Sequence, residues 1–190
     1  MPAATKTDNA NLDLKLALRR HFLDRYHAAG AAVFNACEGN DELWRRLRPG
    51  RHVTYTGVDL KPARGRLCLD SERVLRIPGW KFDVVDLDTY GSPWGHYFAA
   101  LANAPQSFTC FLTFGLVKMG GGVGLPGEFK QVLNPPRETP SSLGGAVQSD
   151  FCLVMVAEAE RRGWQILECK EAVPFEKGTA RYWGLRLAKG

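Results

Sequence analysis

The sequence lacks closely spaced cysteines. No Cys-x-x-Cys pair occurs, and no histidine stands at zinc-finger spacing from any of the five cysteines, which are Cys37, Cys68, Cys110, Cys152 and Cys169. This pattern gives no reason to expect a metal site. An odd number of widely spaced thiols is typical of a reduced cytosolic protein. We therefore expect a cytoplasmic location and reduced, mostly buried thiols.

Long apolar runs are also missing. No stretch reaches the length of a membrane span, and the opening "MPAATKTDNANLDLK" is polar, with no apolar core of a signal peptide behind it. There is no internal repeat and no long run of one charge sign. With 190 residues, 45% of them hydrophobic, the chain suffices for one core and is short for two. We expect a flexible tail over residues 1–11 and a single domain over 12–190.

The charge balance is modestly basic. Lys and Arg number 25 against 20 Asp and Glu, which leaves a net charge of +5 and a pI near 9.0. An excess of this size fits an anionic partner such as RNA or DNA, and it also fits many ordinary enzymes.

Apolar periodicity and turn residues predict strands that alternate with helices. Helices are expected over 12–29, from Asn40 or Asp41, from Ser92-Pro93 to 103, and over 146–163. Strands are expected over 31–36, 52–60, 66–70, 80–88, 107–117, 164–172 and 180–188. Alternation favours an α/β fold with a mostly parallel sheet, and the last two strands form a C-terminal antiparallel hairpin.

Polar side chains mark the ends of the strands in the first half of the chain, namely Asn35, Asp59, Asp70, Asp86 and Asp88. Ligands of such sheets bind in the crevice at the carboxyl ends of the strands. These side chains are therefore the candidates for ligand contacts, although aspartates at such positions are also ordinary turn and cap residues.

A dinucleotide fingerprint is absent from the turn after the first strand. Counted from Gly39, the second and third glycine positions hold Asp41 and Trp44. The turn "NACEGND" is also acidic, which disfavours a pyrophosphate and hence a dinucleotide-dependent oxidoreductase. S-adenosylmethionine carries a sulfonium and an ammonium group and no phosphate, so an acidic turn suits it. Asp59, 24 residues after Asn35, is placed to accept from ribose hydroxyls, and Asp70-Ser71 from an adenine amino group.

The segments "VFNACEGN", "YTGVDL", "CLDSERVL" and "FDVVDLDTYGSP" follow one another in an order that resembles the class I S-adenosylmethionine-dependent methyltransferases. "DLDTYGSP" is similar to the Asp-x-Asp-Pro-Phe/Tyr-Gly-Ser/Thr-Pro motif of the tRNA guanine-N2 methyltransferases, and more broadly to the Asp/Asn-Pro-Pro-Phe/Tyr motif of amino-group methyltransferases. The resemblance implies a Rossmann-like methyltransferase sandwich, S-adenosyl-L-methionine as cofactor, and N-methylation of a nucleic-acid base, with RNA preferred over DNA.

The resemblance also assigns roles to residues. Asp88 would orient the amine that is methylated, and Tyr90 would stack on a planar base. Cofactor contacts fall on Asn35, Ala36, Cys37, Glu38, Gly39, Asp59, Leu60, Asp70, Ser71 and Asp86, with support of the site as the other role of Asp86. Substrate contacts fall on Thr89, Gly91, Ser92, Pro93 and Trp94.

Several alternatives remain at the level of sequence. "DTYGSP" is also an ordinary turn followed by a helix start, and Trp94 is equally suited to the core. Thr89 stands where the tRNA enzymes have proline, and their large C-terminal RNA-binding region has no counterpart in these residues. A methyltransferase-like domain that binds cofactor or a partner without catalysis is therefore the rival hypothesis. Arginines 45, 46, 48 and 51 suit either phosphate contacts or a solvated face, and Lys118 with the glycine-rich loop after it suits a substrate lid or a surface loop.

Overall fold

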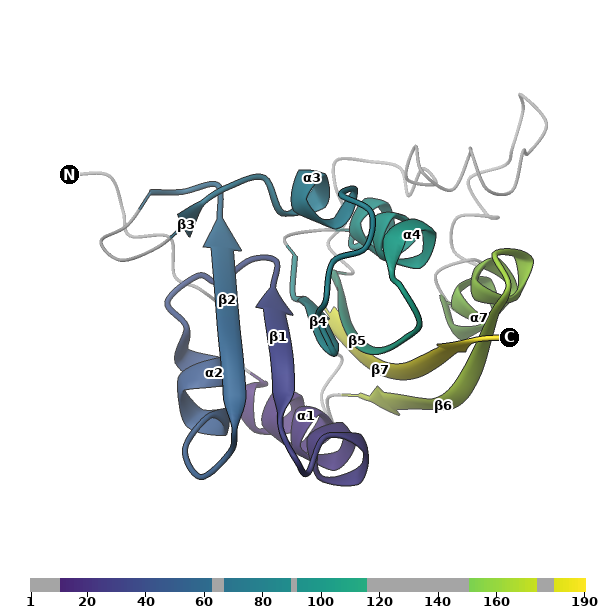
Figure 1. The fold of residues 1–190 in the computed structure, drawn as a ribbon. Coiled ribbons are helices and arrows are strands. Elements are labelled where there is room, and N and C mark those ends of the chain that lie inside the picture. The colour runs from purple at the N-terminus through teal and green to yellow at the C-terminus, as the bar shows by residue number, and fades with distance from the viewer. Residues whose placement is uncertain (1–10, 63–66, 90–91, 116–150, 174–179) are drawn as a thin grey trace, which may run out of the picture.

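The computed structural model describes residues 11–62, 67–89, 92–115, 151–173 and 180–190 (Figure 1). The helices are α1 (Leu12–Tyr26), α2 (Glu42–Leu47), α3 (Ser71–Leu75), α4 (Trp94–Asn103) and α7 (Phe151–Arg161). The strands are β1 (Ala31–Asn35), β2 (Val53–Asp59), β3 (Leu67–Cys68), β4 (Val84–Leu87), β5 (Ser107–Gly115), β6 (Trp164–Ala172) and β7 (Ala180–Lys189).

The described strands form one seven-stranded sheet in the order β3-β2-β1-β4-β5-β7-β6. Strands β1 to β5 pair in parallel, whereas β7 is antiparallel to both β5 and β6. The α/β class, the mostly parallel sheet and the C-terminal antiparallel hairpin are therefore confirmed. Strand β4 lies between β1 and β5, so the acidic segment that ends it is central in the sheet (Figure 1).

Consecutive residues of each central strand point to opposite sides of the sheet. Since these residues are apolar, both faces must be covered, and helices pack on each of them. On one face, α1 and α2 pack against side chains such as Val33, Val84 and Phe111. On the other, α3, α4 and α7 pack against side chains such as Phe34 and Val85. Each strand thus supplies one residue to each core in turn, which explains the uninterrupted apolar runs of the sequence.

Some boundaries differ from the predictions. Strand β4 begins at Val84, later than expected, because the Asp83 carboxylate instead accepts the Ala32 N–H at 2.7 Å. Helix α4 starts one residue late, with Pro93 as its N-cap, and α7, which is described from Phe151 onward, ends at Arg161, two residues earlier than predicted. Asn11, assigned to the tail, is anchored by a hydrogen bond from its side-chain amide to the Tyr182 hydroxyl at 3.1 Å. The rest of the predicted tail, Lys118 and the loop after it lie outside the described residues.

Candidate functional site

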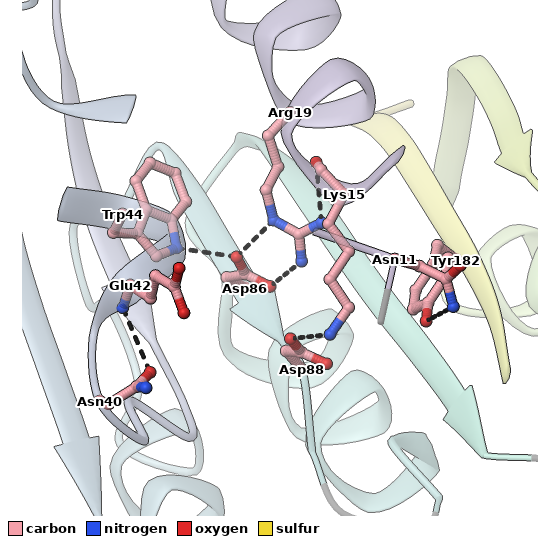
Figure 2. Close-up of polar contacts among 9 residues, drawn as sticks. All are labelled: Asn11, Lys15, Arg19, Asn40, Glu42, Trp44, Asp86, Asp88 and Tyr182. Atoms are coloured by element: carbon pink, nitrogen blue, oxygen red, sulfur yellow. Dashed lines mark hydrogen bonds and ion pairs between the residues drawn. The ribbon is translucent and has the colours of Figure 1, made fainter. Parts of the chain in front are cut away.

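Asp86 is buried in an ion pair beneath the end of β4. Its carboxylate accepts two hydrogen bonds from the Arg19 guanidinium, each at 2.7 Å, and one from the Trp44 indole at 2.8 Å (Figure 2). Both charged side chains are 1% exposed. Burial opposes the charge of Arg19, but the attraction of Asp86 outweighs it and raises the pKa of the guanidinium. Of the two roles predicted for Asp86, this geometry fits support of the site, because its carboxylate is buried and accepts three hydrogen bonds from the protein.

Asp88 lies one pleat further along, where β4 ends. The Lys15 ammonium donates to its Oδ2 at 2.6 Å, and the side chains of Lys15 and Asp88 are 7% and 27% exposed (Figure 2). Burial raises the pKa of the Asp88 carboxyl, but the cations Lys15 and Arg19 more than offset this, so the pKa falls below its usual range. Asp88 is therefore an ionised, oriented and partly accessible acceptor.

Helix α1 provides both cations from one stripe. Asn11, Lys15 and Arg19 follow one another at intervals of four residues and so share a helix face. That face lies over two rows of the sheet. The lower row joins Asp86, Phe111 and Gly184, and the upper row joins Thr113 and Tyr182, two residues further along β5, as Asp88 is two residues further along than Asp86.

In each row, side-chain packing adds to the charge interactions that hold α1 on the sheet. The Arg19 guanidinium lies 4.9 Å from the Phe111 ring centroid, and a Cβ on Gly184 would meet the Phe22 ring at 2.5 Å. In the upper row, the Lys15 ammonium lies 5.1 Å from the centroid of the Tyr182 ring, whose hydroxyl accepts from Asn11. The helix is thereby fixed over the acidic end of β4.

The turn after β1 is tied to the end of β2. Glu38 N–H donates to the Val58 carbonyl at 2.9 Å, and Gly39 N–H donates to the Asp59 carboxylate at 3.1 Å. Gly39 has a φ of +56°, which favours glycine. A Cβ on Gly57 would lie 2.4 Å from the Glu38 carboxylate, so Glu38 packs directly on β2. Glu38, Gly39 and Asp59, predicted to share a cofactor site, are thus brought together.

Asn35 supplies a buried polar atom beside this turn. Its amide donates to the Tyr55 hydroxyl at 3.0 Å, while its Oδ1 has no hydrogen-bond partner in the described part of the chain. The residue is 6% exposed. Burying an unpaired carbonyl is costly, so this atom is suited to accept from a ligand. Ala36 and Cys37 follow it in the same turn.

The arginines around α2 neutralise part of the acidic turn. Arg48 pairs with Asp41 and lies 4.5 Å from the Tyr55 ring centroid, and Arg46 pairs with Glu42 at 2.6 Å. Arg51 pairs with Asp24. These three guanidinium groups are engaged with carboxylates, which favours the structural interpretation of the cluster over phosphate contacts. It also weakens the argument that the acidic turn excludes a pyrophosphate.

The residues predicted to meet adenine have structural partners. Asp70 caps α3 by accepting from the N–H groups of Glu72 and Arg73. The Ser71 hydroxyl is buried and bonded to His96 Nε2 at 2.8 Å, and burial lowers the pKa of His96. Leu60, by contrast, is 70% exposed directly after Asp59. The Ser71 hydroxyl is thus already hydrogen-bonded within the protein, whereas Leu60 leaves an apolar surface at this edge.

The substrate residues of the fourth motif divide similarly. Trp94 is 1% exposed and packs against Tyr97, Phe98 and Phe114, so the core alternative describes its side chain. Pro93 is buried and Ser92 is half-buried at the start of α4. Thr89 is 7% exposed, and its hydroxyl has no hydrogen-bond partner within the described ranges. Tyr90 and Gly91 lie outside the described residues.

No protein-family model and no curated protein matches the sequence. Among solved structures, the chain is similar to Trm1 from Pyrococcus horikoshii in complex with S-adenosyl-L-methionine, with a TM-score of 0.60 and 16% identity over 95% of this chain. It spans 54% of the length of that protein. It is also similar to M. jannaschii TYW2 in complex with AdoMet, with a TM-score of 0.57 and 7% identity over 90% of this chain and 75% of the other.

The strand order and these similarities agree. The chain has the Rossmann-like methyltransferase fold. Identities this low show the fold alone. The [4+2]-cyclase SpnF shares the fold too, at a TM-score of 0.53 and 12% identity over 92% of this chain and 80% of the other. The fold therefore does not identify the reaction, which must be inferred from the residues of the site.

Lys15 and Arg19 are the site residues that sequence reasoning missed. Counted from Leu12, they occupy positions i+3 and i+7 of the buried helical stripe, where apolar residues are expected. Two cations on a buried stripe require two anions to pair with, and Asp86 and Asp88 are such a pair on one face of an apolar strand. The sequence therefore did contain a signal: two cations on an apolar helix face and two acids on an apolar strand face, which can pair with each other.

Proposed function

We propose that this chain is an S-adenosylmethionine-dependent methyltransferase that methylates an amino group of a nucleic-acid base, with RNA preferred over DNA. The observation that carries the proposal is Asp88, an ionised carboxylate at the end of the central strand β4, oriented by Lys15 and still partly exposed. The motif around it is similar to that of the tRNA guanine-N2 methyltransferases.

The residues at the ends of β1 and β2 fit the cofactor. Asn35 offers an unpaired acceptor, which suits the ammonium group of the methionine part. Asp59 spends lone pairs on Gly39 and Lys61, and a carboxylate has capacity for a ribose hydroxyl besides. Leu60 offers an apolar contact for the adenine ring. When bound, S-adenosylmethionine would supply a methyl group on a sulfonium, and transfer of that methyl group to the amine would leave the electron pair of the C–S bond on sulfur.

The protein's own contribution is to position the nucleophile. The lone pair of an exocyclic amine is delocalised into the ring, which makes the amine a poor nucleophile. A carboxylate that accepts one of its N–H groups holds the nitrogen pyramidal and directs the lone pair. Asp88 is suited to this task, because the ion pair with Lys15 fixes its orientation and keeps it ionised. The product ammonium then loses its proton to Asp88 or to water.

The test combines activity with binding. Purified protein is incubated with methyl-labelled S-adenosylmethionine and a panel of RNA, DNA and protein, while calorimetry measures binding of the same cofactor and of NAD. Label on an RNA base, with no binding of NAD, is the expected result. Binding of S-adenosylmethionine without transfer to the panel would favour the non-catalytic alternative. The departure of Thr89 from the motif of the tRNA enzymes favours the same alternative.

A further inference from the structure

The Lys15 ammonium is buried with hydrogen-bonding capacity to spare. An ammonium group has three N–H donors, and that of Lys15 makes one hydrogen bond to a described residue, to Asp88 Oδ2. Its side chain is 7% exposed, so water has little access to the remaining donors. Burying an ammonium with unused donors is costly unless a partner arrives to complete them.

Asp88 has the complementary capacity. Lys15 occupies its Oδ2, and the side chain is still 27% exposed. An acceptor and unused donors therefore lie side by side at the end of β4. The pair is also held in place, because Arg19 fixes α1 one turn away on Asp86 and Tyr182 lies under the ammonium. Preorganised groups of this kind recognise a ligand without reordering.

We propose that Lys15 is a specificity-determining residue, which donates to a hydrogen-bond acceptor directly beside the amino group that Asp88 receives. This inference rests on the proposed function. The substrate group is then an amine on a ring carbon whose neighbouring ring nitrogen accepts a hydrogen bond. Adenine, cytosine and the N2–N3 edge of guanine have this arrangement, whereas a lysine side chain has none.

The experiment pairs a change in the protein with a change in the base. Full-length parent and Lys15→Met are assayed with short RNAs that carry adenine, cytosine or guanine, and with matched RNAs in which that ring nitrogen is replaced by C–H (1-deazaadenine, 3-deazacytosine, 3-deazaguanine). The parent should prefer one natural base over its deaza analogue by about 10-fold or more, the effect of losing a hydrogen bond to a charged group. Lys15→Met should reduce that ratio to about twofold or less, because it lacks the donor.

Two controls protect this comparison. Lys81→Met removes an exposed lysine and should keep the parent's ratio. The ratio within one variant does not depend on the fraction of folded protein, and thermal unfolding checks that Lys15→Met folds. A discrimination ratio that is the same in parent and Lys15→Met would overturn the inference.

If the parent methylates none of these RNAs, the proposed function fails on this panel, and binding decides the inference instead. Fluorescence titration of the protein saturated with S-adenosylhomocysteine then compares the natural and deaza nucleosides. A preference of about 10-fold that disappears in Lys15→Met supports Lys15 as the reader of the ring nitrogen. Equal affinity of the parent for both nucleosides, or no binding of either, overturns it.

Discussion

Asp86 and Asp88 are two residues apart on one strand, yet their surroundings separate their roles. Asp86 has three hydrogen bonds to buried donors and is 1% exposed, so its charge is an internal part of the fold. Asp88 has one cationic partner and an accessible side. The residue nearer the core therefore holds α1, and the residue at the strand end is left to meet a ligand.

Asp86→Asn is expected to destabilise the fold rather than act on catalysis. The substitution leaves Arg19 buried without its counter-charge, which costs about 3–5 kcal/mol in the free energy of unfolding. Urea unfolding measures this change, and Asp13→Asn on the exposed side of α1 is the control. A loss smaller than about 1 kcal/mol would mean that the Asp86–Arg19 pair is not the anchor described here.

Asp59→Ala tests the cofactor edge. Removing the carboxylate should weaken binding of S-adenosylmethionine by about 1–3 kcal/mol, through the lost ribose contact and through the lost tie to Gly39. Calorimetry gives the affinity, with Asp24→Ala as a surface control. Unchanged affinity would remove Asp59 from the site.

At the scale of the element, α1 illustrates what pattern reasoning reaches and where it stops. Its existence and start at Leu12 follow from apolar spacing, and the structure agrees. Its function did not follow, because a helical period identifies a buried face without saying which polar residues on it find partners. The pairing of Lys15 with Asp88 spans 73 positions of sequence and depends on the order of strands in the sheet.

At the strand ends, too, the sequence predicts which residues lie near one another but not which contacts they make. The predicted sheet brought Asn35, Asp59 and Asp88 to one edge, because parallel strands share their carboxyl ends. The occupation of Ser71 by His96 and the burial of Trp94 were not predictable in the same way. The first depends on how α3 and α4 pack together and the second on how α4 packs on β5, and a motif encodes neither.

His27, directly after α1, predicts that the stability of the protein depends on pH. His27 bonds to Thr109 at 2.8 Å, and its burial, with the nearby Arg186, lowers its pKa from 6.5 to about 4. Its folded-state pKa is depressed, so the unfolded chain binds the proton more readily, and the protein loses stability as the pH falls from about 6.5 towards 4.

Replacing this ring should remove that loss. Urea unfolding of the parent and of His27→Gln at pH values across this window gives the difference in slope, and His52→Gln at the surface is the control. Equal slopes in parent and His27→Gln would show that His27 is not the group that titrates.

At the scale of the whole molecule, the net charge of +5 predicts weak nucleic-acid binding that depends strongly on salt. Three arginines near the first turn are spent on carboxylates, so the charge is not focused there. Filter binding of a short RNA should weaken by about tenfold or more between roughly 50 and 200 mM salt. Affinity that hardly changes with salt would contradict binding driven by phosphate contacts.

No helix in the described ranges combines the length and apolarity needed to cross a membrane.

The most direct test of the account is methyl transfer by Asp88→Asn, measured at saturating S-adenosylmethionine on the RNA that the parent methylates. The carboxamide keeps the size of the side chain and one acceptor oxygen but removes the charge. The account predicts nearly unchanged affinity for the cofactor and a rate lowered by about 10²-fold or more, because the lost interaction belongs to the transition state. A variant as active as the parent would contradict the account, and would make Asp88 an ordinary residue of the turn that ends β4.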